Sequence, residues 1–154
     1  MLKLSFSVKG WNDYTFQDMI DLAVENDYMG IDLCPGAYPE YFDKNGVFDK
    51  YNSGATIRSL RDKGLNIPVI NYSDDIAGDN ADEIVCKIKS YIDFAASIRV
   101  PYVAFFASES ETAKANVISV LSQVHEYAYE KNVTILLKTK GLFADTSVLR
   151  DVLM

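Results

Sequence analysis

The sequence predicts an α/β fold built from strand–helix units that follow one another along the chain. Short apolar runs alternate five times with longer segments in which apolar residues recur every three or four positions. The expected strands are almost continuously apolar, as in a parallel sheet that is covered by helices. Residues 8–13, after the first strand, contain one glycine and no glycine-rich phosphate loop, which disfavours an open nucleotide-binding sheet. We therefore expect parallel βα units of a (β/α)8, or TIM, barrel.

The first units are marked by changes of periodicity and by a helix cap. Apolar and polar residues alternate over residues 2–8, which predicts the first strand, and residues 29–33 form a second apolar run. Between them, Thr15 and Asp18 have the spacing of a capping box, which predicts the start of a helix. Residues 34–52 are rich in proline, glycine and aromatic side chains, and we expect them to form a long loop.

Cap and stop residues mark the next unit. Ser53 is expected to cap a short helix that ends at Gly64. The third strand is expected over residues 66–72, with Pro68 near its start because proline interrupts a strand interior.

The last two units follow the same pattern. A long helix is expected to begin after Asp79 or Asn80, and Glu109 and Glu111 are expected at the start of the following helix, where acidic side chains suit the helix dipole. The expected remaining elements are a strand at 102–106, a helix at 112–130, a strand at 133–137 and a helix from Asp145.

The composition excludes some classes of function. Hydrophobic residues make up 49% and charged residues 24% of the chain, as in an ordinary globular protein. The formal net charge of −7 and the lack of a concentrated basic stretch argue against nucleic-acid binding. No signal peptide or membrane span is apparent, so we expect a cytoplasmic protein with no membrane partner. Cys34 and Cys86 are expected to be thiols in a reducing compartment.

The chain is shorter than a complete barrel. A (β/α)8 barrel needs about 250 residues, whereas this chain has 154, and residues 148–154 are still apolar-periodic without a stop signal. We expect residues 1–154 to form a single domain that is the N-terminal portion of a TIM barrel, incomplete at about five of eight units. Five parallel strands leave open edges, so we expect either a homo-oligomer or contact with the missing barrel units.

Several segments resemble one enzyme family. They are residues 3–7 with Gly10-Trp11, residues 19–23, residues 30–33, and residues 136–141 followed by residues 143–146. In order and spacing they resemble the N-terminal part of sugar phosphate isomerase/epimerases, the xylose isomerase-like barrel family. The resemblance implies a metal-dependent isomerase of carbohydrate metabolism, with a sugar or sugar phosphate as its small-molecule partner.

The resemblance also implies a metal site that this chain does not reproduce. Complete family members are expected to bind a divalent metal (Mg, Mn or Zn) through carboxylate and histidine ligands, the first of which is a glutamate on the fifth strand. Lys138 stands at that position, and an ammonium group has no lone pair to offer a cation. The other ligands come from later strands. We therefore expect no cofactor in this chain.

Five residues are candidates for substrate binding, and each has an alternative role. Trp11 could stack on a sugar ring or pack structurally, and Asp32 could bind a polar substrate or form an ion pair. Asn71 could line the site or cap a polar turn. Lys138 and Lys140, on one face of the fifth strand, could bind a phosphate or carboxylate, while Lys138 could instead form an ion pair or reach solvent. The catalytic residues are unknown.

Three functions remain open. The first is a sugar isomerase/epimerase-like protein that is inactive as this isolated chain. The second is a non-catalytic carbohydrate- or anion-binding protein in which Lys138 has displaced the metal. The third is a self-associating half-barrel whose open edges pair with a second copy.

Overall fold

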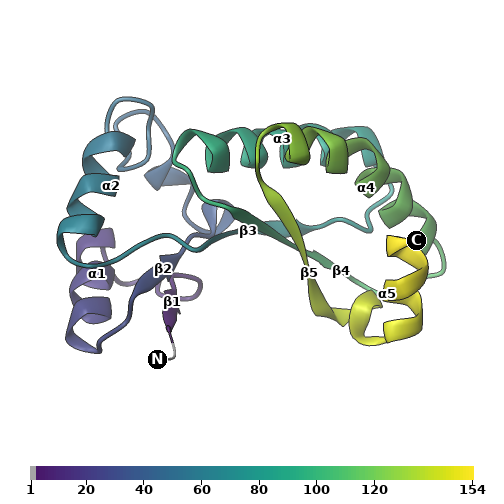
Figure 1. Cartoon of the computed structure of the whole chain (residues 1–154), viewed down its shortest axis with the longest axis horizontal. Coiled ribbons are helices and arrows are strands. Elements are labelled where there is room, and N and C mark those ends of the chain that lie inside the picture. The colour runs from purple at the N-terminus through teal and green to yellow at the C-terminus, as the bar shows by residue number, and fades with distance from the viewer. Residues whose placement is uncertain (1–2) are drawn as a thin grey trace. The chain divides into compact units, whose positions relative to one another are not determined.

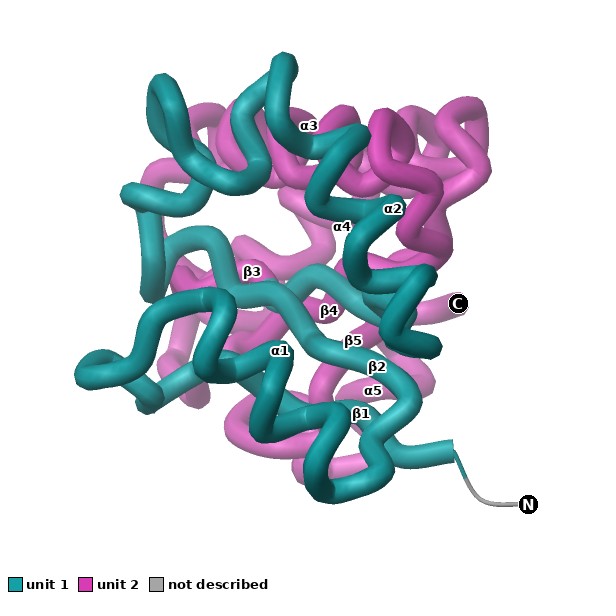
Figure 2. Tube along the Cα trace, turned by 90° about the vertical axis from the view of Figure 1, so that its left-hand side faces the viewer, with its two compact units in different colours: residues 1–71 teal, residues 72–154 magenta. Residues whose placement is uncertain are grey.

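The structure is a computed structural model that describes residues 3–154. Contacts divide the chain into two compact units, residues 1–71 and residues 72–154, which are coloured separately in Figure 2. We call them the first and second units. The expectation of a single domain stays a prediction.

The first unit contains two strand–helix pairs and the start of a third strand (Figure 1). Its elements are β1 (Ser5–Ser7), α1 (Phe16–Glu25), β2 (Gly30–Asp32), two 3-10 turns (Pro35–Ala37 and Pro39–Tyr41), α2 (Ser53–Asp62) and the first residues of β3 (Val69–Asp75). β1 pairs with β2 in parallel, with Phe6 opposite Ile31. A parallel bridge between Leu33 and Ile70 continues this order toward β3.

Local side chains explain where the helices of the first unit begin. Both bonds of the predicted capping box are present, since the Thr15 hydroxyl accepts from the N–H of Asp18 at 3.2 Å and the Asp18 carboxylate accepts from the N–H of Thr15 at 2.9 Å. The predicted cap at Ser53 is wrong, because Ser53 is already helical. Instead, the Asp49 carboxylate accepts from the N–H of Asn52 at 2.7 Å before the helix starts.

The second unit contains a three-stranded sheet in the order β3-β4-β5, and β4 and β5 are parallel. Its further elements are α3 (Ala81–Ser97), β4 (Tyr102–Ala107), α4 (Ala113–Glu130), β5 (Thr134–Gly141), a 3-10 turn (Leu142–Ala144) and α5 (Thr146–Leu153). Helices α3 and α4 lie on the same side of this sheet (Figure 1). Each buries a stripe of its predicted apolar residues, among them Ile84, Ile88 and Ile92 of α3 and Val117, Val124 and Ala128 of α4.

Several expected boundaries are wrong. β3 begins at Val69, after Pro68, because proline cannot donate to the strand ladder. It then runs to Asp75, so Asn71 lies inside the strand rather than at its end. Glu109 and Glu111 precede α4, whose first turn contains no acidic residue. The helix starts two residues later, at Ala113, which is fully buried.

The end of β5 is irregular and depends on a glycine. The pairing of β4 with β5 is regular up to Phe105 and Leu137 and then shifts, so that Ala107 pairs with Gly141. Gly141 has a φ of +57°, and a Cβ there would collide with the carbonyl oxygen of Ala107. A residue without a side chain is therefore required where β5 leaves the sheet.

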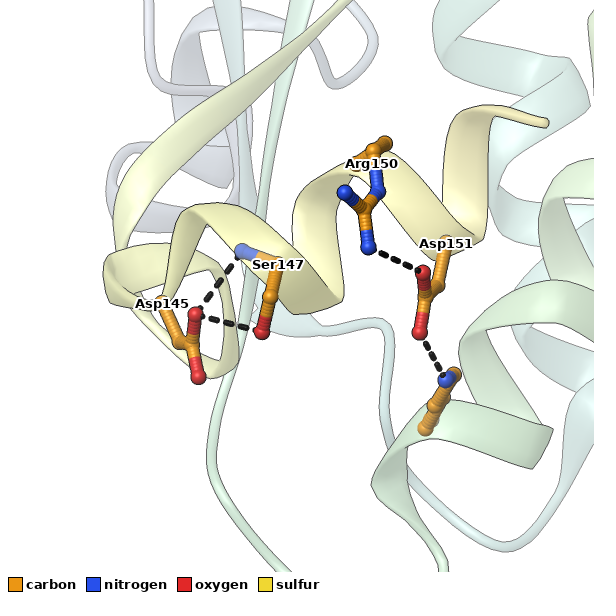
Figure 3. Close-up of polar contacts among 5 residues, drawn as sticks. Asp145, Ser147, Arg150 and Asp151 are labelled. Carbon is orange, nitrogen blue, oxygen red and sulfur yellow. Dashed lines mark hydrogen bonds and ion pairs between the residues drawn. The ribbon is translucent and has the colours of Figure 1, made fainter.

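Helix α5 is fixed at both ends by carboxylates (Figure 3). The Asp145 side chain caps the helix by accepting from the N–H of Ser147 at 2.8 Å. Near the other end, Asp151 lies 3.5 Å from the guanidinium of Arg150 and 2.8 Å from the ammonium of Lys114 on α4. These exposed pairs fix the orientation of α5 against α4 more than they stabilise the fold.

Two further expectations from the sequence concern the cysteines and membrane-spanning helices. Cys34 is a buried thiol and Cys86 an exposed one. Among residues 3–154, no helix combines the length and the apolar character needed to cross a membrane.

The geometry of Gly141 predicts a large effect of a small substitution. Gly141→Ala should destabilise the protein by more than about 2 kcal/mol, because it adds a steric clash to an unfavourable backbone conformation. Gly64→Ala is the matched control, since Gly64 also has positive φ (+77°) but has open space around its Cβ position, and should cost about 1 kcal/mol. Urea unfolding of both variants measures the difference, and equal losses would contradict the role given to the clash.

Candidate functional site

The first unit carries a polar strip on one face of its strands. Ser7 pairs with Asp32 in register, so their side chains share a face, opposite the fully buried Ile31. The bridge between Leu33 and Ile70 places Asn71, by alternation, on the same face as Asp32. Two of the sequence-predicted candidates, Asp32 and Asn71, therefore lie on neighbouring parallel strands with the same orientation.

The carboxylate of Asp32 is held by a side chain from the neighbouring strand. The Ser5 hydroxyl donates to Oδ1 of Asp32 at 2.6 Å, and Asp32 itself is half-buried. Asn71 is anchored through its backbone, because its N–H donates to the carbonyl of Leu33 at 2.7 Å. Both residues are thus held by short contacts at fixed strand positions.

Trp11 lies just after β1 and is partly covered by other aromatic rings. Its indole packs against Phe6, with centroids 4.9 Å apart, and against Tyr14 at 5.2 Å. The backbone N–H of Trp11 donates to the hydroxyl of Tyr38 at 2.8 Å. The residue remains half-exposed, so the geometry is compatible with both predicted roles of Trp11, packing and sugar stacking.

The long loop at 34–52 is packed by its own aromatic rings. Tyr38 stacks on Tyr41 with an interplanar angle of 5°, and Phe42 stacks on Phe48. Phe48 also meets Phe16 of α1 edge to face, with centroids 5.2 Å apart. Sequence patterning indicated the aromatic composition of this loop but not these pairings, of which the contact between Phe48 and Phe16 joins residues distant in the chain.

The two candidate lysines lie in the second unit, where β5 is irregular. Lys138 follows the last regularly paired residue, Leu137, and is half-buried. The ammonium of Lys140 lies 4.5 Å from the centroid of the Phe106 ring, as in a cation–π contact. The prediction that both lysines share one strand face assumed regular pairing, which ends before Lys138.

A hydrogen-bonded turn at the end of β3 was only partly anticipated. The Asp75 carboxylate accepts from the N–H of Ala77 at 2.8 Å. This bond forms a local polar turn, the structural role that the sequence offered for the end of the strand. The carboxylate also accepts from the N–H of Ser108 at 3.1 Å and, through a short contact, from the Ser108 hydroxyl. The carboxyl end of β3 is therefore joined to the segment after β4, a long-range contact for which sequence spacing gives no signal.

These contacts determine the acidity of Asp75. Burial alone would raise the pKa of its carboxyl group, but the hydrogen bonds from Ser108 and Ala77 stabilise the charged form more strongly. The net result is a pKa below the ordinary value.

A buried hydroxyl on the helix-covered face of the second unit was also missed. Tyr72 is 2% exposed, and its hydroxyl has no hydrogen-bond partner among the described residues. Burial raises the pKa of Tyr72 to about 12, with a smaller contribution from Asp74. The ring packs edge to face against Tyr91 of α3 and Phe105 of β4, which assigns Tyr72 to the core rather than to the polar strip.

The residues present do not fit the divalent metal that the sequence resemblance implies. Within residues 3–154, no group of three or more His, Cys, Asp or Glu side chains is placed to hold a metal ion. Lys138 occupies the position of the first expected ligand, and its ammonium cannot coordinate a cation.

Comparison with solved structures gives the fold. The probable 3-DHS dehydratase AsbF from Bacillus anthracis aligns with 99% of this chain at a TM-score of 0.75 and 18% identity, and 58% of its own length is covered. A sugar phosphate isomerase/epimerase from Parabacteroides distasonis aligns with 97% of this chain at a TM-score of 0.66 and 15% identity, with 61% of its length covered. The IOLI protein, solved with a bound zinc atom, aligns with 88% of this chain at a TM-score of 0.70 and 17% identity, with 51% covered.

The chain has a partial (β/α)8-barrel fold of the xylose isomerase type. This confirms the predicted fold class and the structural side of the sequence resemblance. No family model matches the sequence, and neither does any curated protein. The partial barrel spans only about three fifths of the length of the first two structures above. Since they comprise a dehydratase and an isomerase/epimerase, the shared fold does not specify the reaction.

The lowered pKa of Asp75 predicts an acid-sensitive contribution to stability. Because the pKa in the folded state lies below that in the unfolded state, the stabilisation is full above about pH 4 and is lost as pH falls through the folded pKa. Asp75→Asn should lose about 1–3 kcal/mol at pH 7 and show a flatter decline in stability below about pH 4. Urea unfolding across this pH range tests the prediction, and parallel declines in both proteins would refute it.

Proposed function

We propose that the chain binds a sugar or sugar phosphate and supplies binding groups of an isomerase/epimerase-like barrel, without catalysing isomerisation by itself. The observation that carries the proposal is the polar strip of the first unit, where Asp32 and Asn71 share a strand face and Asp32 is oriented by Ser5 at 2.6 Å. In (β/α)8 barrels, ligands bind at the carboxyl ends of the strands, and Asp32 is the last residue of β2.

The chemistry of the strip suits sugar hydroxyls. A carboxylate can accept about four hydrogen bonds, so Asp32 can receive hydroxyl donors in addition to Ser5. The side-chain amide of Asn71 provides both donor and acceptor groups, as a sugar hydroxyl requires, and one of its two N–H groups donates to the carbonyl of Leu33 at 3.4 Å. Trp11, just beyond β1, offers a flat apolar ring of the kind that stacks on the C–H face of a sugar.

The lysines of β5 would serve an anionic group of the ligand. Lys138 and Lys140 are separated by one residue, and the position of Lys140 over Phe106 keeps its ammonium near an apolar surface. A phosphate ester carries charge that an ammonium binds readily. The proposal therefore assigns recognition of an anion to these lysines of the second unit.

Lys138 argues against catalysis by this chain alone. Proton transfer between adjacent sugar carbons, as the resemblance implies it, needs a carboxylate base and a metal that polarises the oxygens. Lys138 repels such a cation rather than binding it. The self-associating half-barrel stays an alternative, and light scattering over a dilution series would reveal it.

Binding measurements without metal test the proposal. D-fructose, D-fructose 6-phosphate and inorganic phosphate are titrated calorimetrically into the protein in EDTA. The unaltered chain should bind all three ligands. Asp32→Asn should weaken binding of both sugars by about tenfold, the equivalent of 1.4 kcal/mol, because it weakens the acceptor for sugar hydroxyls. Lys138→Met should weaken only the two phosphate-containing ligands.

Lys114→Met is the control for loss of one positive charge, because Lys114 lies on α4 and makes only an exposed ion pair. It should leave all three affinities unchanged. Absence of sugar binding, or isomerisation of D-fructose 6-phosphate by the chain with added Mg²⁺, would refute the proposal.

A further inference from the structure

The hydroxyl of Tyr38 joins the end of β1 to the following loop. It donates to the carbonyl of Val8 at 2.6 Å and accepts from the N–H of Trp11 at 2.8 Å. Tyr38 itself is 4% exposed. One buried hydroxyl thus satisfies two backbone groups that lie three residues apart, and it approaches them from a segment about 30 residues further along the chain.

The ring that carries this hydroxyl is itself fixed. Tyr38 stacks on Tyr41 at a centroid distance of 5.2 Å, and Tyr41 packs against Phe16 of α1 at 5.5 Å. Phe16 in turn meets Phe48, which is 4% exposed. The position of the Tyr38 hydroxyl is therefore determined by packed rings of the helix and the long loop.

We propose that Tyr38 is a positioning residue that holds Trp11 against Phe6, so that the indole forms a preorganised stacking surface for the apolar face of a sugar ring. The aromatic loop at 34–52 is then the fixed segment that orients the indole of Trp11. This inference deepens the proposed function and rests on it for the identity of the ligand. The link between Tyr38 and Trp11 stands on geometry alone.

The physical reason is the cost of weakening the hydrogen bonds of these backbone groups. Removing the hydroxyl leaves the backbone N–H of Trp11 and the carbonyl of Val8 with only their long mutual contact of 3.4 Å in place of two short bonds. The turn between Val8 and Trp11 would then be held by that one weak bond. Trp11 would then lose its fixed position on Phe6, and a ligand would have to order it again on binding.

Trp11 reports on its own position, because it is the only tryptophan in the chain. The test compares acrylamide quenching of its fluorescence in the ligand-free protein with that in Tyr38→Phe, which keeps the ring and removes the hydroxyl. We expect at least a twofold rise in the quenching constant. Tyr41→Phe is the matched control, since its hydroxyl makes one long contact of 3.4 Å, and its quenching should equal that of the unaltered chain.

Titration with D-fructose then tests the consequence for the ligand. Tyr38→Phe should bind about five- to tenfold more weakly, and Tyr41→Phe should bind normally. A raised quenching constant in a protein that never binds D-fructose refutes the proposed function but leaves the positioning role of Tyr38 supported. Unchanged quenching in Tyr38→Phe overturns the positioning role, whatever the sugar affinity.

Amide hydrogen exchange in the unaltered chain is a second test, which does not require Tyr38→Phe to fold. The N–H of Trp11 donates to a buried hydroxyl and should exchange at least tenfold more slowly than the neighbouring N–H groups of Asn12 and Asp13, which lie on exposed residues. Exchange of the Trp11 N–H at the rate of these neighbours would overturn the proposal.

Discussion

Parallel pairing of neighbouring strands is the constraint on which the arrangement of each unit depends. A strand can lie parallel to its predecessor only if the chain returns along the sheet between them, and here helices provide the return. All strands of a unit then end at the same edge. The pairing of β1 with β2 and of β4 with β5 therefore decides which residues can gather at that edge before any of their side chains is considered.

The two faces of the strands carry side chains of different polarity. The face covered by helices is apolar, with Ile31 and Leu33 in the first unit and Val103 and Phe105 in the second almost fully buried. In β2 the polar Asp32 alternates with Ile31 and Leu33, so the pleat excludes it from that face. The carboxylate of Asp32, which lies between two buried aliphatic residues in the sequence, therefore lies on the opposite face. There the Ser5 hydroxyl donates to it at 2.6 Å.

Sequence patterning predicted what depends on local spacing. The five strand–helix repeats followed from periodicity, and the capping box of Thr15 and Asp18 followed from a three-residue spacing that sets its own geometry. The predicted cap at Ser53 was wrong because Asp49, further from the helix, bonds the preceding N–H groups. The shifted end of β5 and the contact of Asp75 with Ser108 were beyond prediction, since each depends on a partner from a distant part of the chain.

The same distinction separates the candidate residues from the groups that hold them. Trp11 and Asp32 became candidates from the sequence because a polar or aromatic residue at a strand end is conspicuous there. Tyr38 was not, since one tyrosine among several in a loop carries no signal until its hydroxyl is seen between Val8 and Trp11. Binding surfaces depend on such supports, because a side chain that must be ordered by its ligand contributes less affinity than one already in place. In the proposed arrangement the aromatic loop is therefore part of the binding site, and the buried rings of Tyr38 and Phe48 fix it to the rest of the unit.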